Sequence, residues 1–313
     1  SPVNADNPVE RVAARATALA ERYMPDAFVF ALGATLLVLV GALVVDPAMR
    51  ADPTLLVLAW GNGFLELIKF TLQMSMIVIG GFVLASSPPV ARLIERLALL
   101  PRDGRQAVTL VAVAAMLSSL LNWGFSLIFG ALFARAVARN RPDADYRALA
   151  AASFLGLGTV WAQGLSGSAA LQMASPTSMP RALVEIVGDP IPLTETIFRW
   201  QSMVCVVIEI VVVTAVVWFA APGPGRARNA ASLGVDLEDR HEAPAGPSTP
   251  GERLEHSPAL LLPVVILGFA YLFLSIRDRS TGPGDALNAL DFNTINLFLL
   301  MAGGLLHWTP VSL

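Results

Sequence analysis

Two clusters of small and polar residues lie inside long uncharged stretches of the sequence. The first reads Asn122-Trp123-Gly124-Phe125-Ser126, and the second reads Gly164-Leu165-Ser166-Gly167-Ser168. Such residues interrupt helices and supply hydroxyl, amide and free backbone N–H donors. Two helix breaks that face one position would bind an anion, because free N–H groups and the positive end of a helix dipole favour negative charge. The residue types therefore indicate a site for a small anion such as a carboxylate.

Several residues of these clusters are candidate ligands of the anion. One helix end contributes only about 0.3–2 kcal/mol, whereas dehydrating a carboxylate costs several kcal/mol, so both breaks and their side-chain donors would be needed. Close helix packing is the alternative role for the serines, a capped turn for Asn122 and a simple kink for the second cluster. The candidate substrate-binding residues are Asn122, Trp123, Gly124, Ser126, Gln163, Ser166, Gly167 and Ser168.

An acidic residue lies near the centre of an apolar run. Glu209 interrupts Trp200–Ala221, which is otherwise uncharged. Carboxylates inside membrane segments usually have a function, so Glu209 is a candidate for coupling to H⁺ or Na⁺, with structural pairing as the alternative. We expect no resident metal or cofactor. The single cysteine, Cys205, excludes an internal disulfide and a cysteine-based zinc site.

The composition indicates that these clusters lie in a membrane. Of 313 residues, 55% are hydrophobic and only 14% are charged, which leaves too few charges to cover a soluble surface of this size. The net charge of −3 argues against a nucleic-acid binder. Spans are predicted at 27–45, 70–87 and 200–221, with two more apolar runs at 258–276 and 292–306, and 91–100 reads as a short interfacial helix.

The segment 106–134 requires a different arrangement. Its 29 residues would form one helix of about 44 Å, too long for a single span. Both of its flanks are basic, so both should lie on the cytoplasmic side. We predict a re-entrant hairpin with its tip near Asn122 and with Ser126 capping the returning half. The segment 148–180 is predicted as a helix through Gln163 that breaks at Gly164–Ser168.

The basic residues set an orientation and a domain plan. Fifteen of the 21 basic residues fall in the proposed cytoplasmic segments, five fall outside, and Lys69 is the remaining one. This predicts a multi-pass inner-membrane protein of the bacterial type with a cytoplasmic N-terminal segment, 1–26. A first membrane repeat would cover 27–221, a disordered cytoplasmic loop 222–257, and the start of a second repeat 258–313. Since the chain opens at Ser1 and ends just after an apolar run, we expect it to be truncated.

Two other classes of protein compete with an anion carrier. Gly164-Leu165-Ser166-Gly167 fits the Gly-x-Ser-Gly motif of intramembrane serine proteases, with His307 as the one histidine beside an apolar run. However, His307 is flanked by Leu306 and Trp308 rather than by small residues. A non-transporting receptor is the third class, but it would not need two helix breaks at one depth.

The sequence resembles the short-chain fatty acid transporter family over most of residues 20–221. The resemblance is carried by Glu21–Phe28, Ala85–Arg92, Asn122–Phe125, Gly164–Ser168 and Asp291–Asn296. It implies an all-α fold of two inverted repeats, each with a re-entrant hairpin and a broken helix. It also implies a secondary carrier for short monocarboxylates such as acetoacetate or butyrate, and homodimers occur in the wider superfamily. Family members carry a histidine after the tryptophan that precedes the second cluster, whereas here Ala162 and Gln163 follow Trp161, which puts substrate choice in doubt.

Overall fold

The structure, a computed structural model, is helical throughout the part of the chain that it describes. These residues are 8–24, 26–64, 68–174, 179, 181–223, 225–237, 249–280 and 289–312, and no strand occurs among them, which confirms the all-α prediction. The chain divides into two compact units, residues 1–71 and 72–313.

The described residues of the first unit form four complete helices, one of which matches a predicted span. The helices are α1 (Pro8–Tyr23), α2 (Ala27–Val45), α3 (Pro47–Ala51) and α4 (Pro53–Gly63). The bounds of α2 agree with the predicted 27–45. The helix begins where the Asp26 carboxylate accepts the N–H of Phe28 at 2.8 Å. Proline at the first helical position then starts both α3 and α4, where its missing N–H costs nothing.

The second unit holds both polar clusters. Its helix α5 begins just ahead of the division between the units. The remaining elements follow in chain order: α5 (Ile68–Ala85), α6 (Pro88–Ala98), α7 (Gly104–Leu121), α8 (Trp123–Asn140), α9 (Tyr146–Ser153), α10 (Leu155–Gly158), η1 (Val160–Gln163), α11 (Ser168–Ala174), α12 (Arg181–Val187), η2 (Leu193–Glu195), α13 (Trp200–Ala220), η3 (Ala231–Leu233), α14 (Pro250–Glu255), α15 (Leu261–Arg279), α16 (Phe292–His307) and η5 (Pro310–Ser312).

Five helical segments among the described residues are long and apolar enough to cross a membrane. They are Phe28–Val45, Pro53–Ala85, Gly104–Leu121, Trp200–Ala220 and Leu261–Arg279, of which the second comprises α4 and α5 on either side of residues 65–67, which lie outside the described residues. Helix α13 is an example. Its sequence is strongly apolar, yet none of its residues is buried by the rest of the protein. Lipid is the medium that such a surface favours. The chain is therefore a multi-pass membrane protein.

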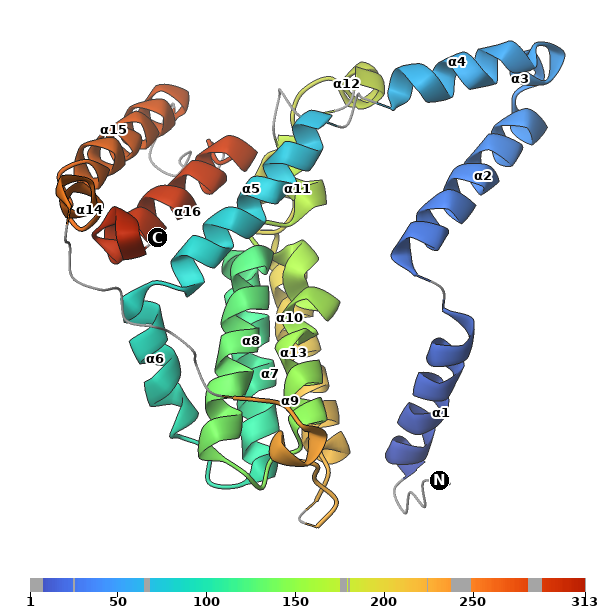
Figure 1. Cartoon of the computed structure of the whole chain (residues 1–313). Coiled ribbons are helices and arrows are strands. Elements are labelled where there is room, and N and C mark those ends of the chain that lie inside the picture. Colours follow the sequence, from blue (N-terminus) through green and yellow to red (C-terminus); the bar gives the residue numbers. More distant parts are fainter. Residues whose placement is uncertain are drawn as a thin grey trace. The chain divides into compact units, whose positions relative to one another are not determined.

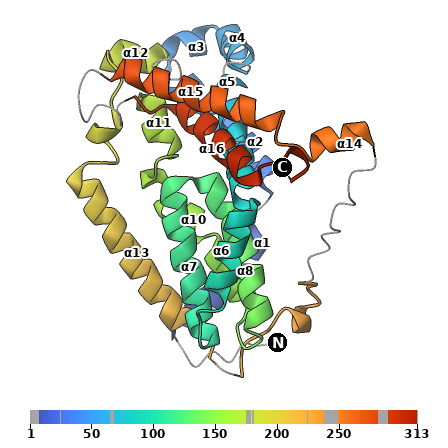
Figure 2. The same cartoon turned by 90° about the vertical axis from the view of Figure 1, so that its left-hand side faces the viewer.

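The core of the second unit forms around α7 and α8, which lie side by side in both views (Figures 1 and 2). Phe125, Phe129 and Phe133 recur every four residues along α8, with ring centroids 5.3 and 5.8 Å apart. The buried positions of α7 that accompany them are mostly alanine and valine. Small residues on one helix allow the large rings of the other to approach.

Two local expectations differ from the structure. The helix predicted from Ala148 to Gln163 is interrupted at Phe154 and Thr159, and its last turn is the 3-10 helix η1. The short helix predicted at 91–100 instead covers Pro88–Ala98, since Pro88 and Pro89 form its first turn.

Part of the predicted disordered loop is also anchored. Arg228 donates its N–H to Asp145 and accepts the N–H of Tyr146, while Ala230 is buried. These contacts hold 225–237 against the start of α9. The remainder of the predicted loop includes residues 224 and 238–248, which lie outside the described residues.

Candidate functional site

A single non-helical residue separates the two arms of the hairpin. Asn122 ends α7 and caps α8: its Oδ1 accepts the N–H of Phe125 at 2.7 Å, and its own N–H donates to Ser118. Asparagine is among the best N-cap residues because its side chain satisfies a first-turn donor. The prediction that Ser126 caps this helix was wrong. The hydroxyl of Ser126 instead donates to the Ala115 carbonyl at 2.7 Å, which ties α8 to α7.

The open ends of the hairpin lie together. The Asp143 carboxylate, just after α8, accepts the N–H of Gly104 at the start of α7 at 2.8 Å. Burial acts to raise the pKa of Asp143, but the donors of Arg141 and Gly104 outweigh it and the pKa lies below its usual value. Each arm has 18 residues, or about 27 Å. The arms are thus longer than the re-entrant halves predicted from 106–134, and the depth of the tip stays a prediction.

The hairpin tip is hydrogen-bonded directly to the helix break at Gly164–Gly167. The Trp123 N–H donates to Ser166 Oγ at 2.8 Å, and the Leu165 N–H donates to the Leu120 carbonyl at 2.8 Å. Gly164 allows this approach, since a Cβ there would lie 2.7 Å from the Ser119 carbonyl oxygen. The two clusters, about 40 residues apart in sequence, therefore form one location.

Helix α5 closes another side of the tip. A Cβ on Gly124 would lie 2.8 Å from the Ile77 carbonyl oxygen, and a Cβ on Gly81 would meet the backbone of Phe125. Backbone therefore packs on backbone, and Gly124 is needed for that close approach. Gly167 has a similar role within the break, where a Cβ would overlap the Ala162 carbonyl. Ser168 is the first residue of α11, and its side chain is half-buried.

The coupling candidate reaches this location through one amide. Gln163, the last residue of η1, donates its Nε2 hydrogen to Glu209 Oε2 at 3.1 Å. Glu209 lies on α13 and is half-buried. A chain of contacts thus leads from Glu209 to Gln163 and, one residue later, to the break that holds the hairpin tip.

Four buried polar atoms around the tip have no hydrogen-bond partner among the described residues. They are Ser119 Oγ, Asn122 Nδ2, Trp123 Nε1 and Gln163 Oε1. Buried polar groups are nearly always paired, and three of these four can donate to an anion. Ser119 was not among the predicted site residues. Its position three residues before Asn122, on the same face of α7, was the signal that could have found it.

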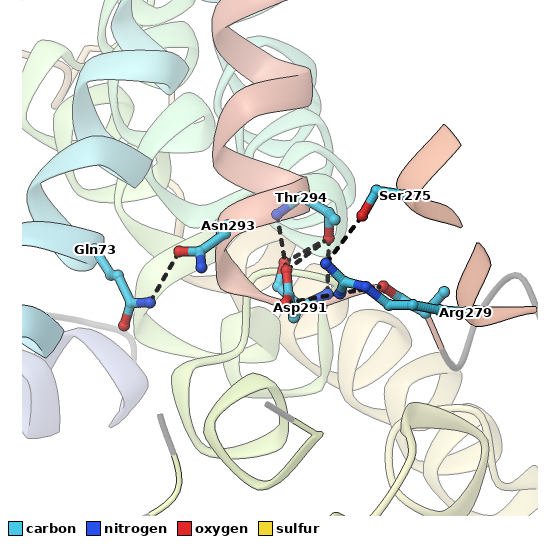
Figure 3. Close-up of polar contacts among 7 residues, drawn as sticks. Gln73, Ser275, Arg279, Asp291, Asn293 and Thr294 are labelled. Carbon is cyan, nitrogen blue, oxygen red and sulfur yellow. Dashed lines mark hydrogen bonds and ion pairs between the residues drawn. The ribbon is translucent and has the colours of Figure 1, made fainter. Parts of the chain in front are cut away.

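A second polar cluster connects α16 to its neighbours (Figure 3). Gln73 of α5 donates to Asn293 Oδ1 at 3.0 Å, and Asn296 donates to the Gln73 carbonyl at 3.0 Å. Arg279, at the end of α15, forms an ion pair of 3.0 Å with Asp291, the N-cap of α16. Sequence reasoning used Asp291–Asn296 only as a mark of resemblance. These side chains hold α15 and α16 in place beside the hairpin.

His307 is far less exposed than an interfacial residue would be. Its Nε2 lies 2.8 Å from the Val83 carbonyl and 3.5 Å from Ser86 Oγ, and only 4% of the residue is exposed. No hydrogen bond joins His307 to Ser166 among the described residues. Among the described residues, the Gly-x-Ser-Gly segment is therefore not paired with the histidine that the protease interpretation assigns to it.

Comparison with known proteins identifies a family. The family described as "Short chain fatty acid transporter" matches residues 8–313. A protein of Escherichia coli named "Putative short-chain fatty acid transporter" is 34% identical over 305 residues, which cover 97% of this chain and 66% of the relative. A protein of Haemophilus influenzae with the same name is 28% identical over 308 residues, with the same coverage. The chain thus spans about two thirds of the length of these curated relatives. No solved structure matches it.

Proposed function

The chain belongs to the short-chain fatty acid transporter family, and from that membership we propose that it contributes the anion site of a secondary carrier for short monocarboxylates. The observation that carries the proposal is the direct hydrogen bond between the two helix breaks, Trp123 N–H to Ser166 Oγ. Butyrate and acetoacetate are the substrates that the resemblance implies. The distribution of basic residues supports, as part of this proposal, a bacterial-type inner membrane with the N-terminus in the cytoplasm.

Side chains would do most of the binding. The N–H groups of Trp123 and Phe125 are already taken by Ser166 Oγ and Asn122 Oδ1, so the backbone donors first expected at the tip are largely used. The Nδ2 group of Asn122 and the Ser119 hydroxyl have no partner among the described residues. Both lie near the N-terminus of the 18-residue helix α8, whose positive dipole end would add to their attraction for a carboxylate.

Glu209 would carry the coupling proton or help to bind Na⁺. Its hydrogen bond to Gln163 connects α13 to the residue just ahead of the break, and Gln163 Oε1 is buried without a hydrogen-bond partner in the part of the chain that the structure describes. Protonating Glu209 would remove the negative charge that Gln163 now pairs with. The Gln163 amide could then turn toward the tip, so that proton binding and anion binding affect each other.

A protease is disfavoured by the same geometry. Ser166 Oγ accepts a backbone N–H, and His307 is held by the Val83 carbonyl on α5. Nucleophilic serine needs a base within hydrogen-bond reach. A receptor without transport is not supported by a specific observation.

Uptake of labelled butyrate into vesicles that contain the complete natural protein tests the proposal. Imposing the pH gradient and the Na⁺ gradient separately would identify the coupling ion. Ser166→Ala and Ser168→Ala should each weaken butyrate binding by about 10- to 100-fold if each removes one hydrogen bond to the carboxylate. Gly167→Val should be worse, since its side chain would overlap the Ala162 carbonyl. Two serine variants that transport like the parent would refute the proposed site.

A further inference from the structure

An apolar cavity of about 580 Å³ opens beside the hairpin tip. Its walls come from the tip, from Leu165 in the break, and from α15 and α16. Helices α15 and α16 contact each other through Phe269 and Phe298, whose rings lie edge to face with centroids 6.2 Å apart. Helices α15 and α16 lie side by side in both views (Figures 1 and 2). The hydrogen bond between Gln73 and Asn293 holds α16 to α5 (Figure 3). These contacts fix the helices that line the cavity, while Leu121, Phe273 and Phe298 of its lining are more than half exposed.

The lining offers one donor. Among the described residues around this cavity none is ionisable, and only Asn122 and Thr294 are polar. The hydroxyl of Thr294 is engaged with Asp291 in the capping box of α16. Asn122 Oδ1 accepts the N–H of Phe125, whereas its Nδ2 is buried and has no hydrogen-bond partner in the described part of the chain. Asn122 itself is fully buried. One hydrogen-bond donor beside a hydrocarbon chamber fits a molecule with one polar head and one apolar tail.

We propose that this cavity holds the alkyl tail of the monocarboxylate, with the carboxylate beside Asn122 Nδ2, so that α15 and α16 determine which chain lengths bind. This inference rests on the proposed function and adds to it a tail site that the anion argument does not require. The volume lies within the range of about 300–1,000 Å³ typical of small-molecule sites. A chamber without charge would reject a second carboxylate, so dicarboxylates should bind poorly.

The proposal predicts how the affinity for a carboxylate depends on the length of its alkyl chain. Each methylene transferred from water to an apolar site increases affinity about 4-fold. Competition against labelled butyrate uptake by acetate, butyrate, hexanoate and octanoate, in vesicles that contain the complete natural protein, should follow this progression until the cavity is full. Succinate should compete poorly, although its length is that of butyrate.

A variant that fills the cavity should shorten the preferred chain. Leu272 lines the cavity on α15 and is only 5% exposed. If Leu272→Trp removes room for two methylenes, hexanoate should lose about 15-fold in affinity while acetate changes little. Ile276→Phe, at a half-buried lining position, should act in the same direction if the tryptophan does not fold. Leu274→Trp is the matched control, since this residue of α15 is 54% exposed and does not line the cavity.

The outcomes separate the two proposals. A chain-length profile that shifts in Leu272→Trp and Ile276→Phe, but not in Leu274→Trp, would support the tail site. An unshifted profile in folded lining variants that still take up butyrate would overturn the tail site alone, and would mean that lipid or other protein fills the cavity. A parent protein that takes up none of these acids would overturn both.

Discussion

Replacing Asn122 by serine should separate two roles of one side chain. Its Oδ1 caps α8 by accepting the Phe125 N–H, and its Nδ2 is the buried donor proposed for the carboxylate. Serine caps helices about as well as asparagine. Asn122→Ser therefore keeps the cap and removes the donor, whereas Asn122→Ala removes both.

The contacts of Asn122 allow the loss of affinity and the loss of stability to be estimated separately. A hydrogen bond to a charged group contributes about 1.5–3 kcal/mol, so both variants should bind butyrate roughly 10- to 150-fold more weakly. Loss of an N-cap costs about 0.5–2 kcal/mol. Because Asn122 is fully buried, water is poorly placed to replace the cap. The free energy of unfolding should thus fall in Asn122→Ala and change much less in Asn122→Ser.

The assay measures binding and stability on the same samples. Butyrate affinity and denaturant unfolding would be recorded for the complete natural protein and both variants in detergent. We expect both variants to lose butyrate affinity equally, whereas the free energy of unfolding should fall mainly in Asn122→Ala. Butyrate binding by Asn122→Ser that equals the parent's would show that Nδ2 is not a ligand, and the reasoning about the tip would fail.

Three further predictions concern topology, coupling and packing. In a cysteine-free background, single cysteines at Arg102 and Asn140 should be labelled only from the cytoplasmic side, because the hairpin ends lie together; labelling from opposite sides would contradict the hairpin. Glu209→Gln should abolish the dependence of butyrate uptake on the pH gradient while butyrate binding persists, and an unchanged dependence would leave Glu209 a structural role. Gly124→Ala should destabilise the fold by about 1–3 kcal/mol in a denaturant titration, since its Cβ would lie 2.8 Å from the Ile77 carbonyl oxygen; Gly158→Ala, with open space around it, is the control.

Much of the fold was predictable from local sequence. The helix 27–45 was identified to the residue, and the helices at the other predicted apolar runs begin and end within a few residues of the prediction, because a bilayer demands long uncharged runs and charges or prolines mark where they end. The turn at Asn122 was also found, since the basic residues at both ends of the hairpin require a reversal near its middle. The extra interruptions at Phe154 and Thr159 were missed, because neither residue is a strong helix breaker.

The sequence by itself determined which residues break the helices, and only the tertiary structure decided what those residues do. Ser166 and Ser126 have the same side chain, yet Ser166 accepts a hydrogen bond from the hairpin tip, whereas Ser126 donates its hydroxyl to a backbone carbonyl of α7. Likewise, the sequence around Glu209 does not predict that Gln163 is its hydrogen-bond partner. The apolar residues of α15 and α16 read simply as spans, and they form a cavity wall only because polar bonds hold α16 against α5. Helix breaks follow from backbone chemistry within a few residues, whereas partners depend on contacts between segments far apart in the chain.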